Sequence, residues 1–340
     1  MDAETLNRLR ARLPDAHLRQ RLLRQTEHVA MRFDVRTIRF LHFYWENFDI
    51  MPKVLGVALK VTGLLEWARA NALRYRVREV EVPIRGLSPA FAGYRILHLS
   101  DLHIDEIRDG GESLRRTIAG LEYDLCVITG DYRFDTYGVF DEVVGRMAPL
   151  LDALRCRDGA VGILGNHDFI EMVPHLEALG MTVLLNESLA IEREGDRIWL
   201  VGLDDAHYYE VHDLARAMAA VDAAQPVVLL VHSPEVIEEA EAMGVDLYLC
   251  GHTHGGQVCL PGEVPVIGNA RCGRDKISGR WTHGQMQGYT HRGTGASGLA
   301  VRINCPPEII LHRLVPAPGS AVASGSTVRP VAAVRPDPPG

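Results

Sequence analysis

The sequence has no long apolar run. Charged side chains recur from Asp2 onward, and no span of about twenty apolar residues occurs, which is the length that a membrane-crossing helix requires. The first residues also lack the apolar centre of a signal peptide. We therefore expect the mature protein to stay on the cytoplasmic side of the membrane.

Positive charge and paired cysteines are also scarce. Lys and Arg number 36 against 44 Asp and Glu, which gives a net charge of -8 and a pI near 6.0, so no overall basic field attracts nucleic acid. The six cysteines include no CxxC pair, and nothing in their spacing requires an oxidising compartment. Cys126 and Cys250 lie in apolar runs, where we expect buried thiols.

Five short motifs each follow an apolar run. In chain order they are Asp101-Leu102-His103, Gly130-Asp131, Gly165-Asn166-His167-Asp168, Val231-His232-Ser233 and Gly251-His252-Thr253-His254. The preceding runs are rich in Leu, Ile and Val and are typical of buried strands. Because ligands bind at the carboxyl ends of strands in α/β folds, we expect the motifs to share one cleft. On an extended backbone Asp101 and His103 would point to the same side and grip one ion, and His252 and His254 repeat that spacing.

This order of motifs resembles the pattern DxH, GD, GNH, H and GHxH of the calcineurin-like metallophosphoesterase family. The resemblance covers roughly residues 76–314, and its later part looks like the bacterial YkuE-type branch. It implies an α/β fold in which two facing mixed β-sheets are flanked by helices in four layers. It also implies a hydrolase that acts on phosphoric esters or anhydrides with two divalent metal ions.

The resemblance implies seven metal ligands. Asp101, His103 and His254 would bind one ion, Asn166, His232 and His252 would bind the other, and Asp131 would bridge the two. We expect manganese, although this ligand set also admits iron, zinc or nickel. Two such ions activate a hydroxide and clamp the phosphoryl oxygens, so we predict no covalent phospho-enzyme.

Three further assignments concern the substrate. In the family the His after the Asn faces the phosphate, so we assign His167, together with Asp131, to catalysis. Asn166 is also assigned to substrate binding. Arg292, in a Gly-rich stretch, either contacts the substrate phosphate or is an exposed loop residue. Relatives of this branch often carry Ser before that Arg, where this chain has His291.

The leading functional hypothesis is hydrolysis of a phosphodiester or pyrophosphate bond, in its sharpest form on a lipid-linked substrate such as UDP-diacylglucosamine. One alternative is a phosphomonoesterase or nucleotide phosphodiesterase with a soluble substrate. A non-catalytic metal-binding scaffold is the third, and the presence of all seven ligand residues disfavours it.

The chain divides into three expected segments. Residues 1–72 form a helical extension, with helices expected at 2–13, 15–33, 35–48 and 52–72. Residues 73–314 form the catalytic domain. Residues 315–340 are dominated by Pro, Ala, Ser, Gly and Val and are expected to be disordered.

The last helix of the extension is strongly apolar outside one narrow face formed by Lys53, Gly56, Lys60 and Gly63. It either packs on the catalytic core or on a second subunit, or it docks on the inner face of the membrane. The second interpretation would be helped by basic residues upstream, namely Arg19, Arg21, Arg24, Arg32, Arg36 and Arg39. The oligomeric state stays open.

Inside the catalytic domain we expect helices at 140–154, 169–179 and 234–243, and antiparallel strands at 298–303 and 308–314. The Gly-rich stretch 255–295 should be poor in strands and wrap the cleft. Asp168 is expected to orient an imidazole, and the large side chains at 132–134 to shape the pocket. The pair Asp204 and Asp205 either forms a turn, which we favour, or supports the metal ligands. The ten other histidines, including His98, are interpreted as ordinary.

Overall fold

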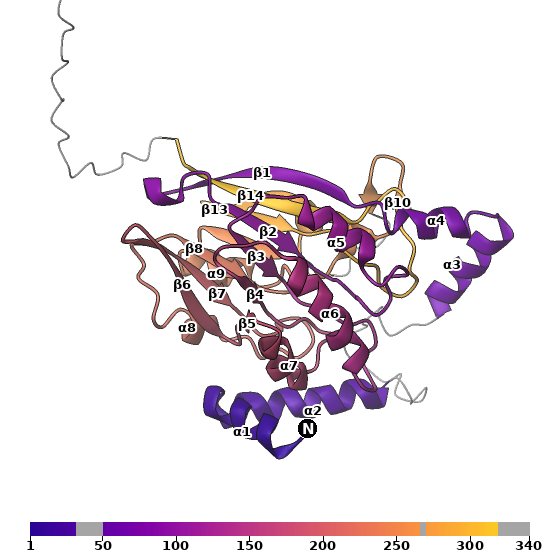
Figure 1. Cartoon of the computed structure of the whole chain (residues 1–340), viewed down its shortest axis with the longest axis horizontal. Coiled ribbons are helices and arrows are strands. Elements are labelled where there is room, and N and C mark those ends of the chain that lie inside the picture. Colours follow the sequence, from indigo (N-terminus) through magenta and orange to yellow (C-terminus); the bar gives the residue numbers. More distant parts are fainter. Residues whose placement is uncertain (32–49, 266–269, 319–340) are drawn as a thin grey trace, which may run out of the picture.

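Two six-stranded mixed sheets form the centre of the structure (Figure 1). The computed structural model describes residues 1–31, 50–265 and 270–318. In the first sheet the order is β1 (Arg76–Ile84), β14 (Glu308–Pro316), β2 (Arg95–Leu99), β3 (Leu125–Ile128), β4 (Ala160–Gly162) and β5 (Met181–Val183). Strands β2 to β5 are parallel, whereas β14 runs antiparallel to β2 and parallel to β1.

The second sheet has parallel strands at its centre and antiparallel strands at its edges. Its order is β12 (Gly279–His283), β13 (Met286–Thr290), β9 (Leu247–Cys250), β8 (Val227–Leu230), β7 (Asp196–Gly202) and β6 (Glu187–Arg193). Strands β13, β9, β8 and β7 are parallel, and β12 and β6 are antiparallel to their neighbours. A separate pair, β10 (Cys259–Leu260) and β11 (Val264–Pro265), lies outside both sheets.

Side-chain alternation along the strands produces four layers. In β2, Ile96 packs between the sheets with residues such as Leu230, whereas Leu97 packs on the opposite face with the helices. Helices α5 (Glu112–Ala119), α6 (Asp141–Ala153) and α7 (Val173–Ala178) cover the first sheet, and α8 (Leu214–Ala217) and α9 (Ile237–Ala242) cover the second. The expected fold class is therefore confirmed, and the three expected helices of the catalytic domain are present with shorter bounds.

The first two helices pack on the catalytic body. In Figure 1, α1 (Ala3–Arg12) and α2 (Asp15–Met31) lie against the end of the body that carries α7. Arg21 of α2 is fully buried, with its guanidinium 3.4 Å from the centre of the Tyr209 ring and 3.6 Å from the Asp204 carboxylate. It also donates a hydrogen bond to the Asp168 carbonyl at 2.9 Å. The expectation that Arg21 assists membrane docking is therefore wrong, because this side chain is enclosed by protein.

The expected helix 52–72 is broken in two. Helix α3 (Ile50–Val61) ends before Gly63, which has a φ of 71°, and α4 (Leu65–Asn71) follows. The Leu64 amide donates to the Leu59 carbonyl at 2.9 Å, which is the bond that closes a helix with a left-handed glycine. Gly63 therefore does not share a helical face with the lysines.

Three other expectations need correction or lie out of reach. Residues 298–303 form bends and a single bridge between Val258 and Ile303, not a strand. The stretch 255–295 is not poor in strands, since it contains β10 to β13, and β13 completes the second sheet beside β9. The expected helix 35–48 and residues 319–340 of the expected tail lie outside the described residues, although β14 extends two residues into the expected tail. Among the described residues, no helix combines the length and apolarity needed to span a bilayer.

Replacement of Arg21 by Ala should lower the free energy of unfolding by about 3 kcal/mol, because loss of one partner from a buried ion pair leaves the Asp204 carboxylate inadequately compensated. Urea denaturation monitored by circular dichroism measures the change. Arg19→Ala, an exposed arginine of the same helix, is the matched control and should shift stability by about 0.5 kcal/mol or less. Equal effects of the two substitutions would show that Arg21 does not hold α2 to the core.

Candidate metal centre

The five motifs meet where strands of both sheets end. Strands β2, β3 and β4 of the first sheet and β8 and β9 of the second lead directly into the motif loops. All seven expected ligands are buried there, with exposed fractions of 0 to 8%. The sequence thus predicted correctly that separate loops share one location.

The backbone of these loops is not extended. Five of the expected ligands have positive φ: Asp101 at 50°, His103 at 39°, Asp131 at 55°, His252 at 71° and His254 at 51°. Such conformations cost non-glycine residues about 1–3 kcal/mol each and persist only where the surrounding structure enforces them. The reasoning from strand alternation was therefore wrong, because the chain turns sharply after each strand and the turn aims the side chains.

Glycines let the loops approach one another. Gly130 has a φ of 89°, and a Cβ on it would lie 2.5 Å from the Gly165 amide nitrogen. A Cβ on Gly165 would collide with the Asp131 carboxylate, and one on Gly251 would collide with Ser100 and Asp101. No side chain fits at these three positions without displacing an expected ligand or the backbone next to one.

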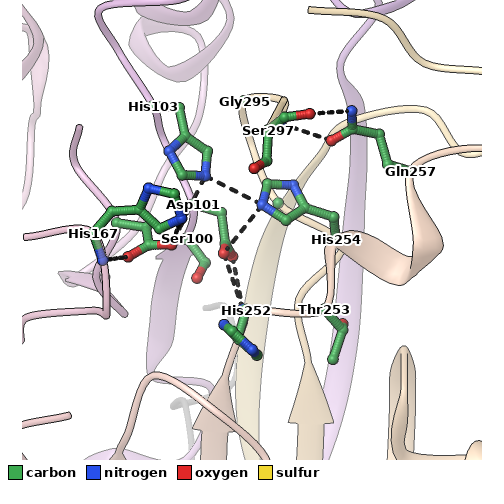
Figure 2. Close-up of polar contacts among 12 residues, drawn as sticks. Ser100, Asp101, His103, His167, His252, Thr253, His254, Gln257, Gly295 and Ser297 are labelled. Carbon is green, nitrogen blue, oxygen red and sulfur yellow. Dashed lines mark hydrogen bonds and ion pairs between the residues drawn. The ribbon is translucent and has the colours of Figure 1, made fainter. Parts of the chain in front are cut away.

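Asp101, His103 and His254 form one potential metal-binding group. Their ligand atoms lie within 4.8 Å of one another. The Nε2 atoms of His103 and His254 are 3.2 Å apart, and His254 Nε2 is 3.5 Å from Asp101 Oδ1. Figure 2 shows both imidazoles directed toward the Asp101 carboxylate, which also accepts the His252 amide.

The other three expected ligands gather beside this group. The Asn166 side-chain oxygen is 2.9 Å from His232 Nε2 and 3.0 Å from His252 Nδ1. Asp131 Oδ2 is 3.3 Å from His232 Nε2 and 3.8 Å from His103 Nε2. The Asp131 carboxylate therefore lies between the two groups, at the place expected of a bridging ligand, and Asp101 also belongs to a group with Asp131 and His232.

The hydrogen bonds of the imidazoles fit a metal centre. His103 Nδ1 donates to the Arg133 carbonyl and His232 Nδ1 donates to the Thr129 carbonyl, each at 2.7 Å. These bonds orient each ring so that Nε2, which carries the lone pair in the neutral tautomer, faces the centre. Lone pairs and carboxylate oxygens thus converge at short distances, and divalent cations satisfy such a set of donors.

Burial shifts the titration of the centre. Burial raises the pKa of Asp101 to about 7 and, acting on a base, lowers the pKa of His103 to about 4. The pKa of His254 is likewise lowered by burial and by the adjacent His103. Near neutral pH the imidazoles of His103 and His254 are therefore neutral, as metal ligation requires. The pKa of His232 is raised well above its usual value, because the adjacent Asp131 carboxylate outweighs burial, so a proton competes with metal at both Asp101 and His232.

His167 lies at the edge of the centre. Its Nδ1 is bonded to the Phe134 carbonyl at 2.5 Å, and its Nε2 is 4.0 Å from Asp131 Oδ2. Its ring is 5.0 Å from the His103 ring, and its exposed fraction of 9% is the highest among the expected site residues other than Arg292. The structure therefore places His167 beside the ligands and toward solvent, in agreement with a position facing the substrate.

Asp168 has a different task from the one expected. Its carboxylate accepts the amides of Asp131 at 2.8 Å, Tyr132 at 2.9 Å and Gly165 at 2.8 Å. It therefore ties the Gly-Asp loop to the Gly-Asn-His-Asp loop through the backbone, and the expectation that it orients an imidazole is wrong. The nearby histidines of the motif made an imidazole partner plausible, but two of the three backbone donors come from 36 and 37 residues upstream.

The residues after Asp131 only partly match their expected role. Tyr132 and Arg133 are buried in the body, with Arg133 stacked 4.3 Å from the centre of the Phe169 ring. Only Phe134 lies at the site, 5.9 Å from the His103 ring and 6.1 Å from the His167 ring. Tyr132 and Arg133 therefore shape the core rather than the pocket.

Arg292 is ion-paired with acids from two segments. Its guanidinium lies 2.5 Å from the Glu263 carboxylate and 4.0 Å from Glu308, and Arg292 lowers the pKa of Glu263 to about 2. The Arg292 side chain is 13% exposed. Arg292 is thus not an exposed loop residue. Its guanidinium is directed toward Glu263 and Glu308.

The aspartate pair after β7 splits into two roles. Asp205 accepts the amides of Tyr208 at 2.7 Å and Tyr209 at 2.6 Å, which confirms a turn. Asp204 instead contacts α2, with its Oδ2 atom 2.8 Å from His17 Nε2. His98 is fully buried, as expected of a core residue, and contacts His312 at 3.2 Å.

Two residues near the centre were missed. Arg302 is fully buried and donates to the carbonyls of His254 at 3.1 Å and Arg292 at 2.7 Å. His207 is held by Glu235 at 2.8 Å, and its ring lies 4.1 Å from that of His252. Neither belongs to a motif, so only the three-dimensional arrangement identifies them.

Comparison with known proteins agrees with this geometry. Residues 94–256 match the family model described as calcineurin-like phosphoesterase. Phosphodiesterase YaeI of Escherichia coli (strain K12) is 32% identical, over 66% of this chain and 83% of its own length. The chain belongs to the calcineurin-like metallophosphoesterase family. Two uncharacterized metallophosphoesterases of Bacillus subtilis (strain 168) are also similar: YkoQ, 26% identical over 77% of this chain and 98% of its own, and YkuE, 31% identical over 66% and 80%.

Membership of this family makes the protein a phosphoester hydrolase. The family normally binds divalent metals, and the two candidate ligand groups of this chain fit such ions. The expectation of an enzyme is confirmed.

Asp131→Asn should release metal from both groups, because one carboxylate oxygen faces His103 and His232 together. His167→Ala should retain the wild-type metal content, since this ring lies outside both groups. Plasma mass spectrometry of the purified variants gives the metal-to-protein ratio. Metal loss in the His167 variant would make that residue a ligand and overturn its assignment.

Metal affinity should weaken as the pH falls through about 7, because the metal binds the ionised form of Asp101 and the proton binds with a pKa of about 7. Each further pH unit should weaken binding by at least about tenfold, because His232, whose pKa is also raised, has to lose its proton as well. Titration with manganese from pH 8 to pH 5.5, with circular dichroism as a check on folding, measures this. Affinity that is constant over the range would contradict metal ligation by Asp101.

Proposed function

We propose that the protein is a binuclear metal-dependent hydrolase that cleaves a phosphodiester or pyrophosphate bond. The observation that carries the proposal is the convergence of seven buried donors in two adjoining groups, with Asp131 between them. Bound divalent cations supply Lewis acidity and lower the pKa of the water that attacks phosphorus. We propose manganese as the native metal, with iron, zinc or nickel as the alternatives that the ligands admit.

The residues of the chain divide the remaining work. The two buried carboxylates and the amide oxygen of Asn166 would hold the cations. Two divalent ions and two carboxylates leave a net positive charge, which suits an anionic substrate. His167, fixed through Nδ1 by the Phe134 carbonyl, presents Nε2 at the edge of the centre. We propose that it stabilises the transition state or protonates the leaving group, because a positioned imidazole can do either without ligating metal.

Asn166 and Arg292 are the proposed phosphate contacts. Asn166 lies against His232 and His252, so a phosphate that reaches these ligands also reaches its amide. Arg292 packs against Gly255, the residue that directly follows His254. A Cβ on Gly255 would lie only 2.9 Å from Arg292 Cγ, so Arg292 is close to this edge of the centre. Since Glu263 already pairs with Arg292, a phosphate would have to share or replace that carboxylate.

The proposed substrate class is a diester or anhydride attached to a lipid, such as UDP-diacylglucosamine. One similar protein, YaeI, carries the name phosphodiesterase, which favours a diester over a monoester. An acylated substrate requires the enzyme to work at the inner face of a membrane, as a peripheral protein. A soluble nucleotide diester or a phosphomonoester is the alternative, and product analysis separates them.

Incubation of the manganese-loaded protein with UDP-2,3-diacylglucosamine should yield UMP and the acylated sugar phosphate, identified by mass spectrometry. Bis-p-nitrophenyl phosphate tests for diester hydrolysis and p-nitrophenyl phosphate for monoester hydrolysis. Asp131→Asn is the inactive control.

Hydrolysis of the artificial diester alone would exclude this lipid and keep the phosphodiesterase reaction. Faster hydrolysis of the monoester would reverse the proposed preference. Absence of turnover on all three substrates, at full metal content, would favour a metal-binding scaffold.

A further inference from the structure

An apolar face is exposed on α3 and on the chain that follows it. Val54, Val57 and Val61 follow one another at helical spacing on α3 and are 58%, 63% and 82% exposed. Leu64 and Trp67 continue the exposed set into α4, at 47% and 45%. These five residues are called the α3–α4 face. A contiguous set of large apolar side chains in water indicates a surface that binds something.

Packing on the protein body does not account for this face. The opposite side of α3 already packs, because Leu59 is buried in a small cluster with Ala68 and Val301, and Leu55 and Leu299 join it. A Cβ on Gly56 would touch Leu299 at 3.7 Å, so this side sits close to the body. Helix α3 is thus apolar on two sides, of which one is covered within the described structure.

The charges around the face favour an anionic partner. Residues 50–75 contain four basic residues, Lys53, Lys60, Arg69 and Arg74, and one acidic residue, Glu66, whereas the whole chain has a net charge of -8. Lys53 and Lys60 lie seven residues apart, one above the other at the edge of the valine stripe, and both are exposed. Glu66 is paired with Arg69 at 2.8 Å and Arg108 at 3.1 Å. The local surface is therefore positive on a negative protein.

The face is connected to the metal centre through one residue. The Arg302 amide donates to the Ala68 carbonyl of α4 at 2.9 Å, and the Asn71 side chain donates to the Arg302 carbonyl at 3.2 Å. The Arg302 guanidinium in turn holds the backbone of His254 and Arg292. Hydrogen bonds through Arg302 thus link α4, which carries part of the face, to the loop of His254. In Figure 1, α3 and α4 project from the body at a different place from α1 and α2.

We propose that the α3–α4 face docks on an anionic lipid bilayer, with the valines, Leu64 and Trp67 in the interfacial region and Lys53 and Lys60 against lipid phosphates. An amphipathic helix with a basic edge and a tryptophan beside it has the composition of interfacial membrane helices. The α3–α4 face would be the membrane contact of the peripheral enzyme proposed above, and in this respect the inference rests on the proposed function. The docking itself requires neither metal nor turnover.

Vesicle sedimentation tests the docking with the full-length protein. Vesicles of phosphatidylcholine and phosphatidylglycerol at three to one should pellet the protein, and vesicles of pure phosphatidylcholine should pellet at least tenfold less. The double variant Val57→Asp, Val61→Asp should lose at least tenfold in affinity. The double variant Lys53→Gln, Lys60→Gln should lose about twenty-five-fold in affinity, at roughly fivefold per basic residue near an anionic surface.

Val139→Asp is the matched control, because Val139 is 83% exposed on a loop outside this face. It should bind vesicles like the wild type. All variants should keep the wild-type rate on bis-p-nitrophenyl phosphate, which shows that they fold. Equal vesicle binding by all variants, or none by the wild type, would overturn the proposal.

Analytical ultracentrifugation without lipid tests whether the α3–α4 face binds a second copy of the chain instead of a bilayer. A wild-type dimer that becomes monomeric in the Val57, Val61 double variant would assign the face to self-association and overturn lipid docking. Vesicle binding without hydrolysis of the acylated substrate would instead retain the docking surface and reject the proposed lipid substrate.

Discussion

The convergence of unprotonated nitrogen and oxygen atoms at one buried point is the constraint on which the rest of the structure depends. Asp101 and Asp131 are buried beside imidazoles whose lone pairs face inward, and isolated buried carboxylates are strongly unfavourable. Divalent cations offset that penalty when bound. The surrounding chain must therefore hold the donors in place against their mutual repulsion.

Most of that holding is done by backbone groups rather than by other side chains. Carbonyls of Arg133 and Thr129 orient His103 and His232, and the carboxylate of Asp168 gathers amides from two motif loops. Because these partners are at the ends of neighbouring strands, their positions follow from sheet register rather than from flexible side chains. The positive φ angles at the ligands are stable for the same reason, since each turn is fastened at both ends.

The sequence was sufficient for the strands that carry the motifs and for the order of the ligands, because buried strands have a strong apolar signal and each motif directly follows one. It was insufficient for the geometry within each motif. Asp101 and His103 reach the centre through a left-handed turn, and the loop–loop contacts that enforce this turn involve Gly251 and Gly295, far away in the sequence. The same limit explains the strands β12 and β13, whose pairing with β9 follows from tertiary contacts rather than from strong local alternation.

The arginines of the amino-terminal extension show why composition alone could not separate the residues that pack on the body from those that face solvent. Arg21 stacks on Tyr209 and is fully buried, although its sequence context matches that of the exposed Arg19 two residues earlier. Its burial depends on Asp204, which lies at the end of β7 and more than 180 residues away. Helices α1 and α2 are thus bound to the body by long-range polar contacts and by leucines such as Leu9 and Leu18 in the main core, whereas α3 packs through a small apolar cluster around Leu59. Two halves of one basic, helical segment therefore have different relations to the catalytic body, and only the second retains an apolar surface for a partner.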